Sequence, residues 1–317
     1  MYSGNPPIGR AEDPLVGRVL GSKYKILSPI GRGSVGTVYR AVRNLIFDEV
    51  AIKVLHPQYA KDSVVVERFH REACAAAQLH DPRIVKIYDY ADMRDEGLVF
   101  LVMELIRGVT LRSLLQTEGP LPIRRAVKLM IEICGGVEVA HRQGIIHRDL
   151  KPDNIMLATS EDSNSREAVV VFDFGVCKLT NDALLQVLTQ PGMIIGTPYY
   201  MAPEQCRGQS PDQRVDVYSL GATLYEMIAG KPPFEGETAL DVLVKQVYED
   251  PEPLTTRCSA SAELNSVVMR ALSKDPRSRQ ADATEFAQDL RRCRRLVSKS
   301  WKYHWGSTMK SFLMTYL

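Results

Sequence analysis

The chain lacks several features that define whole classes of protein. Its six cysteines are scattered, with no CxxC pair and no Cys/His cluster at zinc spacing, which argues against a zinc site or a disulfide framework. Residues 1–10 contain no apolar run, so no secretory signal is predicted. No stretch of about 18 apolar residues predicts a membrane-spanning helix. The net charge is only +2, so we expect no nucleic-acid partner. Together these absences predict a cytoplasmic protein with reduced thiols.

The 317 residues divide into parts that differ in composition and in predicted secondary structure. Residues 1–23 are rich in glycine and proline and are interpreted as a mobile leader. The next stretch, 24–103, predicts mainly strands, at Tyr24–Leu27, Val38–Val42, Val50–Leu55 and Leu98–Leu105, and one helix at Glu67–Leu79. After a hinge at 104–108, residues 109–296 predict helices at Ala126–Arg142, Asp216–Ile228, Ala239–Tyr248, Ser261–Leu272 and Ala283–Leu296. The predicted class is α+β, with a small β-rich part and a larger helical part.

A glycine-rich motif begins at Gly31. The run Gly31-Arg32-Gly33-Ser34-Val35-Gly36-Thr37-Val38 matches G-x-G-x-x-G-x-V. Alone the match is weak, because Rossmann proteins carry the same glycines between a strand and a helix, and an ordinary hairpin turn also fits. Here both flanks predict strands, which favours a hairpin that covers ATP phosphates. Glycine would allow close backbone approach and a positive φ.

A lysine, Lys53, stands inside the apolar strand Val50–Leu55. A buried lysine is costly unless its charge is paired, so it either binds phosphates and a carboxylate or extends to solvent. Glu72, in the predicted helix, is the natural carboxylate. Glu67 competes with it but lies nearer the start of that helix, and Glu72 could also belong to a solvated face.

The most specific motif is His147-Arg148-Asp149-Leu150-Lys151-Pro152-Asp153-Asn154, followed by Asp173-Phe174-Gly175 after an apolar run. Phosphoryl transfer needs positioning and charge neutralisation rather than covalent chemistry. Asp149 can orient an acceptor hydroxyl and take its proton, and Lys151 can neutralise charge on the γ-phosphate. Asn154 and Asp173 supply the oxygen ligands that Mg²⁺ prefers.

Together these motifs resemble the eukaryotic-type (Hanks-type) serine/threonine protein kinases over about residues 24–296, most closely the bacterial branch. The resemblance implies a two-lobe fold with a small antiparallel sheet and one helix in the N-lobe and a mainly helical C-lobe. It also covers Ala202-Pro203-Glu204, the helix aspartate Asp216 that braces the catalytic loop, and Arg279 as partner of Glu204.

The resemblance assigns roles residue by residue. Lys53 and Glu72 become the activating ion pair. The ATP-binding set comprises Gly31, Arg32, Gly33, Ser34, Val35, Gly36, Val38, Ala51, Lys53, Met103, Glu104, Leu105, Ile106 and Met156. The catalytic set comprises Asp149, Lys151, Lys53, Glu72 and Thr197, and the metal ligands are Asn154 and Asp173. The implied reaction uses ATP and Mg²⁺ to phosphorylate protein serine or threonine hydroxyls, since Lys151 and Gly196-Thr197-Pro198-Tyr199 follow the serine/threonine pattern.

Two other functions compete with this one. A pseudokinase scaffold would be expected to lack Lys53, Asp149 or Asp173, and all three are present. A small-molecule kinase would lack the A-P-E segment that builds a polypeptide-docking surface. Arg148 implies control by activation-loop phosphorylation, for which Thr189 or Thr180 is the expected site and a transient homodimer the expected route.

The tail, residues 297–317, mixes lysines with aromatic residues. It is interpreted either as a membrane-surface or partner-docking segment or as a frayed tail that follows a last helix packed on the C-lobe. The sequence leaves both interpretations open.

Overall fold

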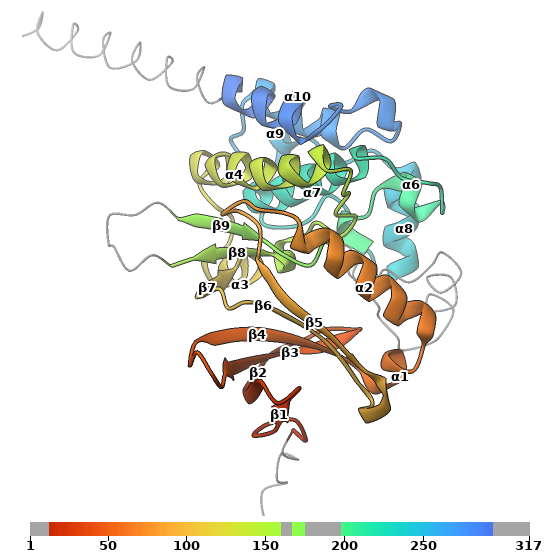
Figure 1. Cartoon of the computed structure of the whole chain (residues 1–317). Coiled ribbons are helices and arrows are strands. Elements are labelled where there is room, and N and C mark those ends of the chain that lie inside the picture. The colour runs from red at the N-terminus through yellow and green to blue at the C-terminus, as the bar shows by residue number, and fades with distance from the viewer. Residues whose placement is uncertain (1–12, 160–166, 175–197, 294–317) are drawn as a thin grey trace, which may run out of the picture. The chain divides into compact units, whose positions relative to one another are not determined.

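The computed structural model describes residues 13–159, 167–174 and 198–293 (Figure 1). The chain divides into two compact units, each described by itself. The N-terminal unit contains residues up to 77 and 86–105. The C-terminal unit contains 78–85 and the chain from 106 onward. The α+β fold predicted from the sequence is confirmed.

The N-terminal unit is built on a six-stranded antiparallel sheet in the order β1-β2-β3-β4-β6-β5 (Figure 1). Its elements are β1 (Val19–Leu20), β2 (Tyr24–Arg32), β3 (Gly36–Arg43), β4 (Glu49–Leu55), α1 (Pro57–Ala60), α2 (Ser63–Ala77), β5 (Ile87–Met93), a 3₁₀ turn (Arg94–Glu96) and β6 (Leu98–Glu104). Alternate residues of β4 and β6, among them Ile52, Phe100 and Val102, fill the core on one face. The side chains on the other face of these strands, such as Lys53, do not belong to this core.

Helix α2 begins at Ser63, four residues before the start predicted from the sequence. Asp62 accepts hydrogen bonds from the amides of Val64 and Val65, at 2.9 and 3.3 Å, and so caps the helix at this earlier point. Its buried residues recur at helical spacing: Val65, Val66, Phe69, Ala73 and Ala76.

The C-terminal unit is mainly helical. Its elements are β7 (Gly108–Thr110), α3 (Leu111–Glu118), α4 (Ile123–Arg142), a 3₁₀ turn η2 (Pro152–Asn154), β8 (Ile155–Ala158), β9 (Ala168–Val171), a 3₁₀ turn η3 (Pro198–Tyr200), α6 (Pro203–Cys206), α7 (Arg214–Ala229), α8 (Ala239–Tyr248), α9 (Leu254–Arg257), α10 (Ala262–Ala271), a 3₁₀ turn (Pro276–Ser278) and a helix over 283–293. Helix α7 is buried on nearly every side and is the centre of this core, against α4 and α10 (Figure 1).

A three-stranded antiparallel sheet, β7-β8-β9, frames the catalytic motifs. Strand β8 follows the His147–Asn154 loop, and Asp173 lies two residues after β9. Residues 78–85 belong to this unit because Ile84 bridges Val171 in parallel register, with hydrogen bonds of 2.8 and 3.0 Å from Val171 N to Arg83 O and from Val85 N to Val171 O.

The predicted leader is too long at its C-terminal end. Residues Val19 and Leu20 pair with Lys25 and Tyr24, and Leu20 is 1% exposed in the core. The apolar side chain of Leu20 therefore anchors a stretch that glycine and proline content alone marked as mobile.

The described part of the chain carries five free cysteines: Cys74, Cys134, Cys206, Cys258 and Cys293. Cys177 lies outside the described residues. Among the described residues, no helix is both long and apolar enough to cross a bilayer.

Candidate active site

The register of the N-terminal sheet collects the predicted ATP-binding side chains on one face. Val38 pairs with Lys53, and Ala51 pairs with Met103. Their strand neighbours fill the core on the opposite face, and side chains alternate along a strand. Val38, Ala51, Lys53 and Met103 therefore share the non-core face of three adjacent strands. An aliphatic surface with one lysine suits an apolar ring joined to phosphates.

The glycine-rich turn joins β2 and β3, as the flanking strands predicted. Gly33 N donates to Gly36 O over 2.9 Å, and His56 reinforces the turn, with Nε2 lying 3.0 Å from Gly33 O and its amide donating to Val35 O. His56 was not singled out from the sequence. Its only signal is its position directly after β4.

None of the three glycines in the turn has a positive φ, contrary to the expectation. A Cβ at Gly36 would lie 2.3 Å from Val54 O, so glycine there permits the close approach of β3 to β4. A Cβ at Gly31 would meet no atom of the described residues within 4 Å. Local packing therefore explains the glycine at position 36 but not the one at position 31.

Lys53 is buried, with 8% of its surface exposed, which excludes the alternative that it extends to solvent. Glu72 is half-buried on α2, whereas Glu67 is exposed and forms an ion pair with Arg71 at 2.7 Å. Burial thus favours Glu72 over Glu67 as the carboxylate that pairs with Lys53.

Glu104 was predicted to offer backbone groups to adenine. Its amide donates to Lys86 O, so this N–H is already used within the unit.

In the C-terminal unit, one carboxylate gathers the catalytic loop. Lys151 Nζ lies 2.9 Å from Asp149 Oδ2, and Asn154 Nδ2 donates to the same oxygen over 3.1 Å and to Asp149 O over 2.9 Å. Burial alone would lower the pKa of Lys151, but the Asp149 carboxylate outweighs this effect and raises it above its ordinary value. Lys151 is therefore a fixed positive charge beside Asp149.

Asp216 holds the turn that carries Asp149. This side chain is fully buried in α7 and accepts hydrogen bonds of 2.8 Å from the amides of His147 and Arg148. Arg148 has a φ of +63°, a conformation that costs a non-glycine residue about 1–3 kcal/mol. The hydrogen bonds from these two amides, together with a third from His141 Nε2 over 2.8 Å, hold Asp216 and the turn in place and offset that strain. Burial opposes ionisation, but these donors outweigh it and keep the pKa of Asp216 below its ordinary value.

His147 is a structural pivot of the loop. Its Nε2 lies 3.0 Å from Phe172 O, a group that can only accept, and its Nδ1 accepts from the amide of Asp149 over 3.2 Å. One ring nitrogen donates while the other accepts, which is the pattern of neutral imidazole. Burial lowers the pKa of His147, against the opposing charges of Asp216 and Asp149, and so favours the same neutral form. The ring also lies 4.7 Å from that of Phe174.

Asp173 is the second non-glycine residue of the site with a positive φ, at +59°. The residue before it is fixed, because Phe172 N donates to Asn154 O over 3.1 Å. The bond therefore links the backbone of Asn154 to the residue before Asp173, and so connects the two predicted metal ligands. Strain at Arg148 and Asp173 together marks the two turns that present Asp149 and the predicted metal ligands.

The segment that begins at Pro198 is tied to the catalytic loop. Gln205 Nε2 donates to Arg148 O over 3.1 Å, and Arg279 pairs with Glu204 as the resemblance implied.

A further polar cluster was missed by sequence reasoning. Arg112 Nη1 lies 2.6 Å from Glu226, and Arg112 also contacts Tyr200 and, at 3.2 Å, Asp153. Tyr200 donates to Glu226 as well. The cluster joins α3, α7, η2 and η3, so it fixes the turn after Thr197 against the catalytic loop. Its members are far apart in sequence, and no local pattern signals them.

Some predicted residues lie outside the described residues: Thr197, Thr180, Thr189, Gly175 and the whole of 297–317. Met156 is half-buried on β8 and pairs with Thr110 and Val170. Exposed positions Arg32 and Ser34 complete the glycine-rich turn, with Val35 half-buried, and Ile106 is half-buried after β6.

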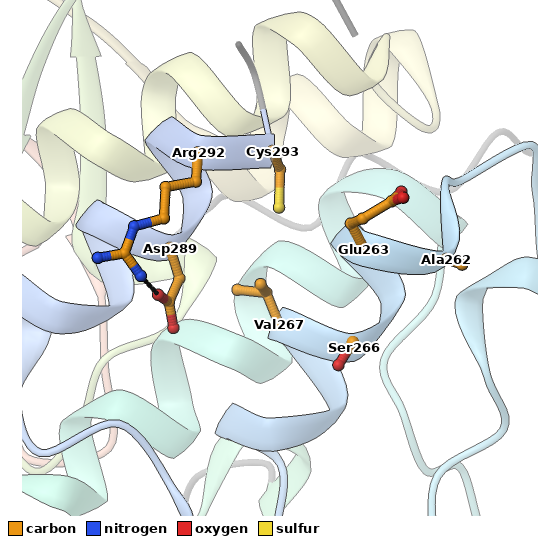
Figure 2. A pocket seen from close by; sticks show the side chains of 7 residues that line it. All are labelled: Ala262, Glu263, Ser266, Val267, Asp289, Arg292 and Cys293. Atoms are coloured by element: carbon orange, nitrogen blue, oxygen red, sulfur yellow. Dashed lines mark hydrogen bonds and ion pairs between the residues drawn. The ribbon is translucent and has the colours of Figure 1, made fainter. Parts of the chain in front are cut away.

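A pocket of about 470 Å³ lies elsewhere, between α10 and the helix over 283–293 (Figure 2). It is lined by Ala262, Glu263, Ser266, Val267, Asp289, Arg292 and Cys293. None of these residues belongs to the catalytic motifs, and Arg292 is paired with Asp289 on the same helix (Figure 2). Among the described residues, no group of three or more His, Cys, Asp or Glu side chains could hold a metal by itself.

Comparison with known proteins agrees with this geometry. The serine/threonine-protein kinase PknB of Mycobacterium tuberculosis is 41% identical over 274 residues, which is 86% of this chain and 43% of that protein. The serine/threonine-protein kinase pkn3 of Myxococcus xanthus is 38% identical over 283 residues, 88% of this chain and 51% of that protein. The chain thus spans about half the length of these curated relatives.

Among solved structures, the crystal structure of the Mycobacterium tuberculosis PknI kinase domain matches with a TM-score of 0.70 and 25% identity. The match covers 88% of this chain and 99% of that one. The family model described as protein kinase domain matches residues 24–291. The catalytic loop, its bracing aspartate and the buried Arg279–Glu204 pair thus stand in a chain that belongs to the protein kinase family.

Proposed function

We propose that this chain is a serine/threonine protein kinase that transfers the γ-phosphate of ATP to hydroxyl groups of protein substrates. The observation that carries the proposal is the constellation around Asp149. One carboxylate is held by Lys151 and Asn154, on a turn braced by Asp216. Such a carboxylate is fixed in direction, as a group must be that orients an incoming hydroxyl and takes its proton.

Each further residue of the predicted site has a defined part in this proposal. Lys151 is held cationic and neutralises charge that develops on the transferred phosphoryl group. Val38, Ala51 and Met103 bind the adenine, and Lys53 binds the phosphates. The glycine-rich turn covers the phosphates, which explains an unhindered glycine at position 31.

Magnesium is the proposed metal. Asn154 directs its amide nitrogen to Asp149, which leaves the amide oxygen as the atom suited to a cation. With the Asp173 carboxylate, the chain offers the oxygen donors that a hard divalent ion requires. When bound, Mg²⁺ would neutralise phosphate charge. Asn154 and Asp173 would hold it, and their backbone link through Phe172 keeps the two turns in register.

The proposal is tested by a radiolabelled ATP–Mg²⁺ assay on the purified chain beside Asp149→Asn, followed by phosphoamino-acid analysis. Phosphoserine or phosphothreonine from the wild type alone is the expected result. Phosphotyrosine would overturn the specificity. ATP binding without transfer in either protein would favour the scaffold alternative.

The proposed regulation is autophosphorylation of the segment that contains Thr189 and Thr180, in a transient homodimer. Arg148 is exposed beside Asp149, where a guanidinium can bind a phosphate. Phosphopeptide mapping after incubation with ATP is expected to find phosphate at Thr189 or Thr180, and phosphate found only elsewhere would reject both sites.

The proposed location is the cytoplasm, where the five free thiols of the described residues would stay reduced. We further propose that the basic and aromatic tail, 297–317, docks on an anionic membrane surface or a partner. Sedimentation with anionic liposomes, with and without the residues after Leu296, separates this from a frayed tail that follows a last helix packed on the C-lobe.

A further inference from the structure

The turn η3, which follows Thr197, is held by its backbone carbonyls. Gln246 Nε2 donates to Pro198 O over 3.0 Å and to Tyr199 O over 2.8 Å. Ser219 Oγ donates to Tyr200 O over 2.7 Å. Three consecutive carbonyls of η3 are thus each bound by a side chain from α7 or α8. Because the bonds come from outside the turn, these helices set its position.

Gln246 is a fully buried amide, with 0% of its surface exposed. Burying an amide is costly unless its polar atoms are paired, and here both ends are. The Tyr218 hydroxyl donates a hydrogen bond to Gln246 Oε1, so the nitrogen end of the amide faces the two carbonyls. The backbone is fixed as well, since Lys274 Nζ donates to Gln246 O over 2.8 Å. Rotation or retreat of this side chain would break several bonds together.

The far end of η3 is tied to the catalytic loop. Tyr200 contacts Arg112, which pairs with Asp153 of the loop at 3.2 Å. The next helix, α6, reaches the loop through Gln205 and Arg148 O. A shift of Pro198 or Tyr199 would therefore change the backbone between Thr197 and the loop that carries Asp149.

We propose that Gln246 is a positioning residue for the polypeptide acceptor. It sets the backbone of Pro198 and Tyr199, and hence the surface on which the acceptor chain lies, without contact with ATP. This inference rests on the protein kinase activity proposed above. It predicts that changes at Gln246 alter acceptor recognition while ATP recognition stays constant.

The sharpest variant is Gln246→Glu, which keeps the shape but replaces the donor nitrogen by an oxygen that faces two carbonyls. We expect the KM for a synthetic acceptor peptide of residues 178–192 to rise by roughly tenfold, as loss of about 1.4 kcal/mol would give. The KM for ATP should stay within about twofold, since the change removes only acceptor positioning. Tyr218→Phe should have a smaller effect, because both Nε2 bonds remain.

The peptide KM measured over a range of pH gives a second test, which is specific to the hydrogen-bond donor at position 246. The carboxyl group introduced by Gln246→Glu can donate one hydrogen bond when it is protonated. The raised peptide KM of this variant should therefore recover as the pH falls, whereas the wild type should show no such recovery. The matched control is Gln209→Glu, the same chemical change at an exposed position three residues beyond α6. It should leave both KM values unchanged.

The two proposals fail in different ways. An unchanged peptide KM in Gln246→Glu beside an active wild type overturns the positioning role. A uniform loss of kcat and melting temperature with both KM values unchanged also overturns it, because Gln246 would then only stabilise the fold. If the wild type transfers no phosphate, the proposed function fails. The positioning role is then decided by calorimetric peptide binding to Asp149→Asn, with and without Gln246→Glu, where equal affinities reject it.

Discussion

Arg279 and Glu204 form a bidentate ion pair inside the C-terminal unit, with Nη1 and Nη2 lying 2.6 and 2.8 Å from the two carboxylate oxygens. The Arg279 side chain is 0% exposed. Its remaining N–H groups donate to the backbone carbonyls of Ser273, Arg214 and Lys274. All five donors of the guanidinium are therefore used, which a lysine could not reproduce.

The first prediction follows from that burial. Arg279→Ala leaves a buried carboxylate without its partner, so the free energy of unfolding should fall by about 3–5 kcal/mol in urea titrations. Arg292→Ala is the control, because Arg292 pairs with Asp289 while 73% of its side chain is exposed. That variant should lose less than about 1 kcal/mol. Equal losses would contradict the prediction.

The second prediction concerns the left-handed backbone of Arg148. Glycine adopts a φ of +63° without a Cβ penalty, whereas alanine does not. Arg148→Gly should therefore be more stable than Arg148→Ala by roughly 1 kcal/mol, measured by chemical unfolding. Both variants lack the guanidinium, so they should lose any response to activation-segment phosphorylation equally. An alanine variant as stable as the glycine variant would mean that the turn relaxes.

The third prediction is a pH dependence from His147. Burial lowers its folded pKa below the ordinary value of 6.5, so the unfolded chain binds more protons in the window below 6.5. The stability is fully present above pH 6.5 and falls as the pH drops through that window, by at most about 1.4 kcal/mol per pH unit. His147→Asn should flatten this slope below pH 6.5. An unchanged slope would assign the effect to other groups.

The fourth prediction separates packing from ligand binding in the glycine-rich turn. Gly36→Ala places a Cβ against Val54 O and should destabilise the chain by about 1–3 kcal/mol. Gly31→Ala meets no described atom, so its melting temperature should stay near that of the wild type while the KM for ATP rises. A stable Gly36→Ala protein would show that β3 and β4 can separate locally.

The sequence was most informative where function depends on short, contiguous spacing. Asp149, Lys151 and Asn154 stand within one loop, and the structure brings them together. The apolar run around Lys53 likewise predicted that this lysine lies inside a strand, where it is indeed buried. Such local patterns carry their own evidence.

What the sequence could not predict depends on distant pairs and on backbone strain. Arg112 meets Tyr200 and Glu226, which lie 88 and 114 positions away, and no periodicity links them. Positive φ was expected at three glycines, yet within the predicted site it occurs at Arg148 and Asp173. At Arg148 the hydrogen bond from its amide to Asp216 holds this conformation. Helix α2 begins earlier than predicted because Asp62 caps it. An aspartate just before an apolar run is a local start signal that the prediction did not use.

The bridge between Ile84 and Val171 has a consequence for synthesis on the ribosome. Residues 78–85 leave the ribosome well before Val171, their partner, is made. At roughly 5–20 residues per second, that interval lasts several seconds. During it the apolar side chains of Ile84 and Val85 lack this strand partner, in a segment that separates the two stretches of the N-terminal unit. Chaperone binding to a ribosome-stalled chain should therefore be strongest for lengths that end between these two partners.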